Sequence, residues 1–290
     1  MGEITLDLTP VDATFGAIIR DVALRSLDAS SFQAIYRAWL EYALLIFPGQ
    51  YLTREEQNEF ALRFGALEFA ATAISNIDKN GQVRFRDGDE VVKALRGNEG
   101  WHHDSTYMPV QAKGAVFTAE IVPAEGAATG WADMAAAYDA LDEATRQRVT
   151  GMQAYHSLVY SQGRVGYLPA KKNDQGGYDQ YGYNVEVVPL RPLVKIHPET
   201  GRANLLIGRH AHNIVGMDPE ESERFVDKLN EDACQPPRIH HHQWTVGDAV
   251  IWDNRRLMHR ATPFDMTEPR RMWHTRIAGE RQSEVALNHA

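Results

Sequence analysis

Residues 249–260 read AVIWDNRRLMHR, and this stretch does most to define the predicted fold. Its first four residues form a short apolar run that is typical of a buried strand. A polar segment follows and leads to a histidine, His259. Polar segments that follow a strand often carry functional side chains, so we expect this part of the chain to contribute to a site.

The rest of the chain predicts helices first and short strands later. Apolar residues recur at helical spacing early in the chain and twice further on, which predicts helices over Asp28–Leu45, Thr53–Phe64, Met134–Val149 and Pro219–Asp232. Short apolar runs predict strands at Leu44–Phe47, Ala115–Val122, Pro192–Ile196, Asn204–Ile207, Ala249–Trp252 and Arg271–Ile277. This order favours an α+β chain with a mainly antiparallel sheet system. A doubly wound fold would need regular strand–helix alternation, and the glycine-rich phosphate loops are also absent.

The composition is that of an ordinary globular protein. The 290 residues are 43% hydrophobic and 24% charged, and Cys234 is the single cysteine. One thiol can form neither an internal disulfide nor a thiolate metal cage, so a reducing compartment is expected. Without a linker, repeat or low-complexity tract, we expect one catalytic domain over residues 1–290.

The charge and the N-terminal sequence narrow the partners and the location. The formal net charge of -9 argues against phosphate-backbone binding, so no nucleic-acid partner is expected. No apolar run approaches the ~20 residues needed to cross a bilayer, and no signal peptide is recognised, so no membrane partner is expected. We therefore expect a cytoplasmic protein that acts on a small molecule, and a homo-oligomer.

The segment GWHHDS, residues 100–105, contains an H-x-D motif. In an extended segment residues i and i+2 project to the same face, so His102 and Asp104 can meet one ion while His103 points away. With His259 they would complete two histidines and one carboxylate, the facial triad of non-haem Fe(II) oxygenases, which leaves positions open for a cosubstrate and O2. H-x-D alone is a weak signal, because a hydrogen-bonded loop histidine is the simpler reading of His102.

Further residues at fixed distances strengthen the assignment. Thr129 lies 27 residues after His102, the segment W-D-N-x-x-x-x-H is formed by Trp252 to His259, and Arg270 lies 11 residues after His259. With Phe15–Ala17, Leu45–Gln50 and Arg63–Gly65, these motifs resemble the taurine dioxygenase/phenoxyalkanoate dioxygenase family of Fe(II)- and 2-oxoglutarate-dependent oxygenases along nearly the whole chain.

The resemblance implies both a fold and an activity. The implied fold is a distorted double-stranded β-helix, or jelly roll, with surrounding helices. The implied enzyme is a non-haem dioxygenase with metal ligands His102, Asp104 and His259, which converts 2-oxoglutarate and O2 to succinate and CO2 while it hydroxylates a substrate. In such enzymes the metal carries the oxidation chemistry and the protein supplies geometry and a dry pocket.

Arg270 and Thr129 are the implied partners of 2-oxoglutarate. The metal would bind one end of this molecule, so its distal carboxylate needs a separate partner. The planar guanidinium of Arg270 can hold a carboxylate through two parallel hydrogen bonds, and the hydroxyl of Thr129 can add a third. Arg271 is the rival residue, but alternation along a strand would place it on the opposite face.

Within the family, the sequence is most similar to the phenoxyalkanoate group, especially enzymes like the (S)-2-phenoxypropionate dioxygenases. The matching segments are residues 100–115, 193–202 and 272–279. The resemblance implies that Arg209, His210 and Arg276 contact the substrate carboxylate. Many relatives instead place an arginine 15 residues after the distal histidine, where this chain has His274.

The predicted function is therefore hydroxylation of a small aromatic carboxylate such as a phenoxyalkanoate. Hydroxylation next to the ether oxygen would release a phenol and a 2-oxo acid, a step in the degradation of an aromatic compound. The alternatives are the same chemistry on another carboxylate or sulfonate, a Zn2+ hydrolase built on the same triad, and a jelly-roll binding protein without catalysis. Arg270 and Thr129 favour the oxygenase, since a hydrolase has no use for a second carboxylate clamp.

Several other segments leave alternatives open. Residues 170–178 predict either a solvated loop or a lid. The run His240–His242 favours a surface strand over a metal site, and His156 favours a buried, hydrogen-bonded histidine over a pocket residue. If Arg276 only makes a structural ion pair and His210 only packs in a loop, the substrate anchor would be sought at Lys171–Lys172 or Lys93.

Overall fold

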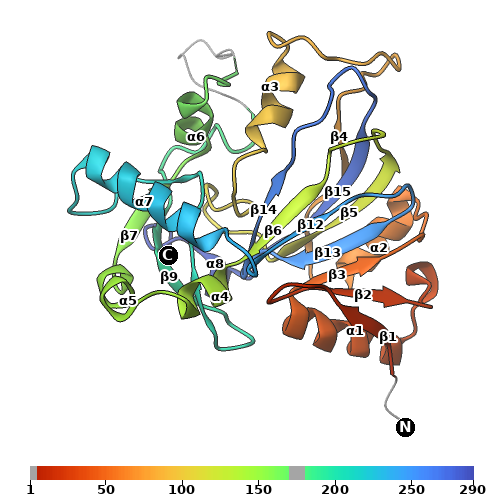
Figure 1. The fold of residues 1–290 in the computed structure, drawn as a ribbon, viewed down its shortest axis with the longest axis horizontal. Coiled ribbons are helices and arrows are strands. Elements are labelled where there is room, and N and C mark those ends of the chain that lie inside the picture. Colours follow the sequence, from red (N-terminus) through yellow and green to blue (C-terminus); the bar gives the residue numbers. More distant parts are fainter. Residues whose placement is uncertain (1–4, 170–179) are drawn as a thin grey trace.

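The computed structural model describes residues 5–169 and 180–290. The helices are α1 (Ala29–Tyr42), α2 (Arg54–Leu62), α3 (Glu90–Gly97), α4 (Met134–Asp139), α5 (Glu143–Val149), α6 (Leu158–Arg164), α7 (Pro219–Ala233) and α8 (Arg281–Glu284), with a short 3-10 turn at Leu24–Ser26 (Figure 1). The strands are β1 (Asp7–Pro10), β2 (Ala17–Arg20), β3 (Leu44–Phe47), β4 (Leu67–Ser75), β5 (Gly114–Ile121), β6 (Thr129–Asp133), β7 (Gln153–His156), β8 (Leu190–Pro192), β9 (Val194–Ile196), β10 (Ala203–Leu205), β11 (Ala211–His212), β12 (Ile239–His242), β13 (Ala249–Asp253), β14 (Leu257–Ala261) and β15 (Arg271–Ile277). Within these ranges no helix is long and apolar enough to span a membrane.

Two sheets form the frame of the site. The large sheet has the order β1-β2-β3-β13-β5-β15-β4, and only its β2–β3 pair is parallel. The smaller sheet has the order β12-β6-β14 and is antiparallel throughout. A buried apolar cluster joins the two sheets, with the rings of Trp131 in β6 and Trp252 in β13 5.9 Å apart. This packing of two mainly antiparallel sheets is the jelly roll that the sequence predicts.

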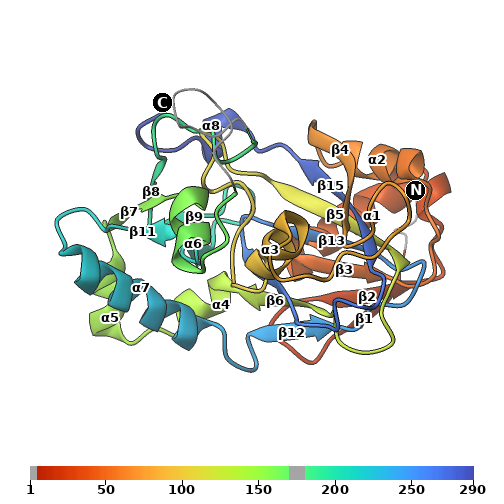
Figure 2. The ribbon, with the colours of Figure 1, turned by 90° about the horizontal axis from the view of Figure 1, so that it is seen from above.

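The two N-terminal helices cover the other face of the large sheet (Figure 2). Asp28 caps α1, because its side chain accepts a hydrogen bond from the Ser31 backbone N–H. Thr53 and Glu56 form a capping box at the start of α2. The predicted helices over Asp28–Leu45 and Thr53–Phe64 are therefore present, with ends that lie one to three residues inside the predicted bounds.

Other predicted elements differ in length or continuity. The helix predicted over Met134–Val149 is interrupted, because Asp142 accepts a hydrogen bond from the Thr145 backbone N–H and begins a new helix, α5. The strand predicted over Pro192–Ile196 is divided between β8 and β9 at Leu193, which is fully buried. Strand β4 and helix α3 are among the elements that the sequence does not predict, together with β1, β2, β6, β7, β11, β14, α6 and α8. The predicted loop or lid at residues 170–178 lies outside the described residues.

Candidate active site

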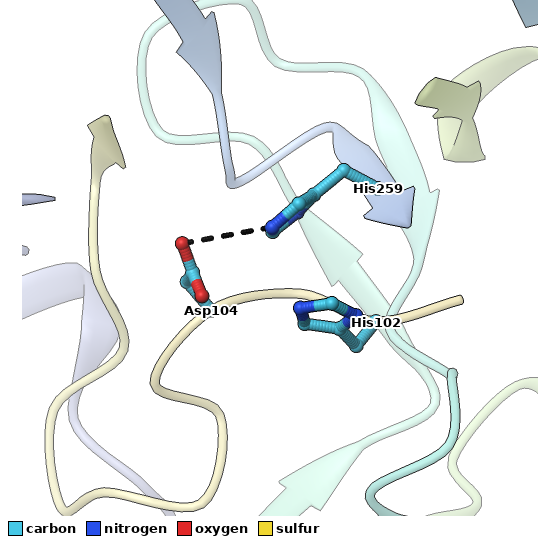
Figure 3. A group of neighbouring side chains, drawn as sticks. All are labelled: His102, Asp104 and His259. Carbon is cyan, nitrogen blue, oxygen red and sulfur yellow. Dashed lines mark ion pairs between the residues drawn. The ribbon is translucent and has the colours of Figure 1, made fainter. Parts of the chain in front are cut away.

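The three predicted metal ligands converge at one point of the jelly roll. His102 and Asp104 lie in the segment between α3 and β5, and His259 lies in β14. His102 and His259 form an antiparallel bridge through two backbone hydrogen bonds of 3.0 and 2.8 Å. His259 Nε2 is 3.9 Å from Asp104 Oδ2, and Figure 3 shows these two side chains pointing toward each other. One ligand atom from each residue lies within 4.8 Å of the others, a spacing that can enclose a single metal ion.

The three residues have the protonation states that binding of a metal ion requires. His102 Nδ1 is 2.7 Å from the Gly100 carbonyl oxygen, which fixes the proton on Nδ1 and leaves Nε2 free to bind a cation. Burial holds the pKa of His102 well below its usual value and lowers that of His259 to about 4. Burial would raise the pKa of Asp104, but the positive charge of Arg276 outweighs it and keeps the pKa well below the usual range. Two neutral imidazoles and one carboxylate are the forms that bind a divalent cation.

Asn254 holds the H-x-D segment in place. Its side-chain oxygen accepts a 2.7 Å hydrogen bond from the Asp104 backbone N–H, and its Nδ2 donates to the Asp104 carbonyl at 3.0 Å. The Asn254 carbonyl is also 2.8 Å from Nδ1 of His103, whose ring is buried away from the triad. The sequence motif contains Asn254, but only the fold shows that it links the two halves of the triad.

Arg270 is a buried arginine without an acidic partner in the described chain. Its side chain lies in the triad's cavity, near the ring of Phe264, and no carboxylate of residues 5–169 or 180–290 pairs with it. Asn76 and Ser75 hold its backbone through hydrogen bonds of 2.8 Å to the N–H and to the carbonyl, respectively. Burial lowers the pKa of Arg270 to about 10. A positive charge in this environment favours an anionic ligand.

Arg271, the first residue of β15, faces away from the cavity that Arg270 lines. Its NH1 group donates to Glu120 at 3.1 Å, and a quarter of its side chain is exposed. The alternation that the sequence predicts therefore places Arg270 inside the cavity and its neighbour outside.

Thr129 lies on the cavity wall at the start of β6. Its Oγ1 accepts a 2.9 Å hydrogen bond from Nε1 of Trp244. Because the indole can only donate, the hydroxyl proton of Thr129 remains available for an acceptor in the cavity. Trp244 was not identified from the sequence, since it lies 115 residues from Thr129 along the chain.

Arg209 and His210 approach the metal site from the turn after β10. The backbone N–H of Arg209 donates to the Trp101 carbonyl at 2.9 Å, and His210 packs edge-on against His102, with ring centroids 5.6 Å apart. Gly208, with φ of +115°, permits this approach, because a Cβ there would lie 3.3 Å from the Cα of His102.

Both side chains are partly held by α6. Arg209 NH2 donates to the Ser161 carbonyl and to Gln162 Oε1, each at 3.0 Å. His210 Nδ1 is 2.8 Å from the Ser161 hydroxyl. Burial lowers the pKa of Arg209 to about 10, and within the described chain no carboxylate pairs with it. Arg209 therefore offers a second positive charge beside the triad, and His210, whose pKa burial holds well below its usual value, adds a neutral ring.

Arg276 occupies a different position from the other two substrate-anchor candidates. It also faces the cavity, but its NH2 group already donates to Asp104 Oδ1 at 2.7 Å. The ion pair that the sequence leaves as an alternative for Arg276 is therefore present, and its partner is a predicted metal ligand.

His274 lies at the position where the family resemblance implies an arginine. Its ring stacks on Trp252 with an interplanar angle of 15° and meets Phe117 edge-on. Its Nε2 lies 3.5 Å from Asp104 Oδ2, and burial lowers its pKa, so it is a neutral wall of the cavity. A cationic anchor for a sulfonate is thus missing at this position.

All eight predicted site residues line one cavity, which has a volume of about 640 Å³ including its mouth. The remaining histidine clusters lie elsewhere. His240–His242 lie in the partly exposed strand β12. Among the described residues, only the triad groups as a metal site. His156 is fully buried as predicted, but neither ring nitrogen has a hydrogen-bond partner in the described structure, so the expectation of a hydrogen-bonded histidine is wrong. Lys93 pairs with Glu90 on α3, and Lys171–Lys172 lie outside the described residues.

Comparison with known proteins identifies the family. Residues 7–277 match the family model described as taurine catabolism dioxygenase TauD, TfdA family. The chain is 60% identical to an (S)-phenoxypropionate/alpha-ketoglutarate-dioxygenase of Sphingobium herbicidovorans, with 98% of both chains covered. It is 33% identical to an alpha-ketoglutarate-dependent 2,4-dichlorophenoxyacetate dioxygenase of Cupriavidus pinatubonensis, over 91% of this chain and 94% of the relative.

A solved structure shows the same architecture. The crystal structure of AAD-2 in complex with Mn(II) and N-oxalylglycine superposes with a TM-score of 0.88 at 33% identity, and covers 98% of this chain and 99% of that one. The chain therefore belongs to the TauD/TfdA dioxygenase family. The predicted family, jelly-roll fold and dioxygenase class are confirmed, and so is the prediction of a metal cofactor and 2-oxoglutarate as cosubstrate.

Proposed function

We propose that this dioxygenase hydroxylates a phenoxyalkanoate with Fe(II), 2-oxoglutarate and O2, and so cleaves an aryl ether. The observation that carries the proposal is the cavity itself, which combines the triad with Arg270, a buried cation that has no carboxylate partner in the described chain. A hydrolase would leave this buried charge without a counter-ion. A cosubstrate with a distal carboxylate supplies one.

In this proposal His102, Asp104 and His259 would hold the iron. The bound iron supplies the oxidation chemistry, with 2-oxoglutarate as the electron donor that leaves as succinate and CO2. Asn254 fixes the backbone on both sides of Asp104, so the carboxylate needs little reorganisation when the metal binds.

Arg270 and Thr129 bind the distal carboxylate of 2-oxoglutarate. The guanidinium can donate two parallel hydrogen bonds, and the Thr129 hydroxyl, oriented by Trp244, can donate a third. Both residues line the same cavity as the triad, so one elongated dicarboxylate can reach both sites.

Arg209 and His210 bind the carboxylate of the substrate. Their place beside His102 would fix one end of the substrate near the metal, and orientation of this kind accounts for much of the rate of such a step. Arg276 also faces this corner and can add its positive field. The neutral ring of His274 makes taurine a poorer candidate than an aryl carboxylate.

The aromatic ring of the substrate has a suitable place between β4 and α3. A second hollow of about 830 Å³ opens there and shares Ile74 and Asn98 with the metal cavity. Val91, Ala94 and Leu95 give it an apolar wall. A ring bound in this hollow would be desolvated while the carboxylate end stays near Arg209.

Hydroxylation of the carbon between the carboxylate and the ether oxygen completes the reaction. The product is a hemiketal or hemiacetal, which collapses to a phenol and a 2-oxo acid. The Sphingobium relative, whose name specifies (S)-phenoxypropionate, makes the S enantiomer of 2-phenoxypropionate the first compound to examine.

The test uses the full chain under anaerobic conditions. Fe(II) and 2-oxoglutarate are added, the metal-to-ligand absorption band is recorded, and O2 is admitted with a panel of phenoxyalkanoates, taurine and aryl amino acids. We expect one phenol per succinate with a phenoxyalkanoate. Coupled turnover of another acid would refute the substrate but not the enzyme class, whereas hydrolysis without succinate would refute the class.

The proposal includes one catalytic domain, a cytoplasmic location and a homo-oligomer, as the sequence predicts. Sedimentation at micromolar concentration tests the assembly. A monomer that is fully active would contradict that part of the proposal alone.

A further inference from the structure

Arg276 is engaged by polar groups on three sides. Its NH2 group donates to Asp104 Oδ1 at 2.7 Å, and its NH1 group donates to Ser105 Oγ at 3.0 Å. Its Nε lies 3.9 Å from Glu68 Oε2 on β4. The face of the guanidinium packs on the ring of Phe69, 4.6 Å from its centroid. Arg276 is only 7% exposed, so these contacts hold its side chain in one position.

The same contacts hold the backbone directly after Asp104. Ser105 has φ of 56°, a left-handed conformation that is strained for a residue with a Cβ. Its hydroxyl donates to Glu68 Oε2 at 2.9 Å and accepts from Arg276. The hydroxyl of Tyr181 also donates to Glu68. Strain of this kind persists only where surrounding contacts over-determine it, and here they come from β4 and β15.

The two oxygens of Asp104 have different surroundings. Oδ1 is bound to Arg276, whereas Oδ2 has no hydrogen bond within the described chain. Oδ2 is also the oxygen that lies 3.9 Å from His259 Nε2. The guanidinium therefore occupies Oδ1 and leaves Oδ2 facing Nε2 of His259 (Figure 3) and, at 3.5 Å, Nε2 of the neutral His274.

We infer that Arg276 is a positioning residue that holds Asp104 with Oδ2 directed at the metal, and that it is not the main partner of the substrate carboxylate. The inference rests on the proposed function, in which Asp104 is a metal ligand. The positive charge of Arg276 is already balanced by Asp104 and, at longer range, by Glu68. Arg209 and His210 then carry the binding of the substrate anion.

The experiment measures metal affinity in the absence of both 2-oxoglutarate and substrate. The metal-free full-length protein is titrated anaerobically with Fe(II), and in parallel with Co(II), whose ligand-field absorption reports the coordination geometry. We expect Arg276→Gln to raise the Kd for Fe(II) about 10- to 100-fold, the range typical for loss of an outer-sphere partner. Arg276→Lys keeps the charge but cannot bridge Asp104 and Ser105 equally well, so it should restore part of the affinity. Arg271→Gln, on the outer face of the same strand, is the matched control and should bind Fe(II) as wild type.

Steady-state kinetics at saturating Fe(II) give a second readout. A positioning role predicts a lower kcat with more succinate formed per phenol, and a KM for the aryl carboxylate within about twofold of wild type. Unchanged Kd for Fe(II) and an unchanged Co(II) spectrum, together with a strongly raised KM for the aryl carboxylate, would overturn the inference and make Arg276 the substrate clamp. If Arg276→Gln does not fold, the Kd for Fe(II) and the KM for the aryl carboxylate are measured on Arg276→Lys, and the same criteria apply.

Failure of the proposed function gives a different result. In that case the wild-type protein would form no succinate from 2-oxoglutarate, and His102→Ala would bind Fe(II) as tightly as wild type. If the Arg276 variants bind Fe(II) more weakly than wild type, and His102→Ala does so as well, the result supports both the proposed function and the positioning role.

Discussion

The two ends of β15 present two buried arginines in contrasting situations. Arg270, directly before the strand, has no carboxylate partner in the described chain, whereas Arg276, near its other end, is bound to Asp104. Both side chains are less than a tenth exposed and line the same cavity. Burial of a charge is unfavourable unless a counter-ion compensates it. The paired arginine therefore organises the protein's own site, and the unpaired one is left for an anionic ligand.

His156 shows the third outcome of burying a basic group. Burial, with a further contribution from the charge of Arg191, holds the pKa of His156 well below the usual value, so the ring stays neutral. An imidazole can lose its proton near neutral pH, whereas a guanidinium cannot do so easily. A buried histidine can thus persist without a counter-ion where an arginine requires one.

Both arginines act through the metal bound by the triad, so removal of a metal-ligating side chain should have the largest effect on turnover. We expect His102→Ala, Asp104→Ala and His259→Ala each to lower turnover at least about 1000-fold, since the open metal face requires all three ligands. The control is His103→Ala, which removes the adjacent ring that faces away and should still bind iron. Activity and bound iron are measured on the same samples. A His103 variant without iron beside a His102 variant with iron would reverse the assignment.

Removal of the Arg270 side chain should have the next largest effect, on the KM for 2-oxoglutarate. We expect Arg270→Ala to raise the KM for 2-oxoglutarate about 100-fold or more, because a desolvated carboxylate loses its bidentate partner, worth ~2–5 kcal/mol. Arg271→Ala should leave this KM unchanged, since its side chain pairs with Glu120 at the surface. If both variants had the same KM for 2-oxoglutarate, Arg270 would not be the residue that binds the distal carboxylate.

Thr129 should contribute less than Arg270. Thr129→Val keeps the shape but removes the hydroxyl, and a hydrogen bond to a charged group is worth ~1.5–3 kcal/mol. We expect the KM for 2-oxoglutarate to rise about 10-fold. Trp244→Phe leaves the hydroxyl in place and should have a smaller effect, as measured by the same titration. A larger effect at Trp244 would mean that the indole, rather than the hydroxyl, determines binding.

The smallest effect concerns stability and pH. His156 is neutral in the folded protein, whereas its pKa in the unfolded chain is about 6.5, so below that pH the unfolded chain binds more protons. The free energy of unfolding should therefore fall as the pH drops below about 6.5, by at most ~1.4 kcal/mol per pH unit from this residue. Urea unfolding at pH 7.5 and 5.5 should show a smaller difference for His156→Leu than for wild type. An identical difference in both proteins would show that His156 is not a source of the acid sensitivity.

The sequence by itself determined the site residues that lie at fixed distances along the chain. The H-x-D spacing brings His102 and Asp104 to one face because extended backbone alternates its side chains, and the same rule separates Arg270 from Arg271. Helix caps at Asp28 and Thr53 are equally local, since a cap depends on residues within one turn. Apolar runs such as residues 249–252 indicated strands for the same reason.

Only the tertiary structure decided which distant residues meet. Asn254 holds the backbone of Asp104 across 150 residues, Trp244 orients Thr129 across 115, and Arg276 binds Asp104 across 172. A buried hydrogen bond or ion pair between such residues depends on how strands β4, β6, β13 and β15 pair and pack, and no local propensity records that pairing. The sequence could therefore place Arg276 in the pocket, but its bond to a metal ligand arises from the register of the folded sheets.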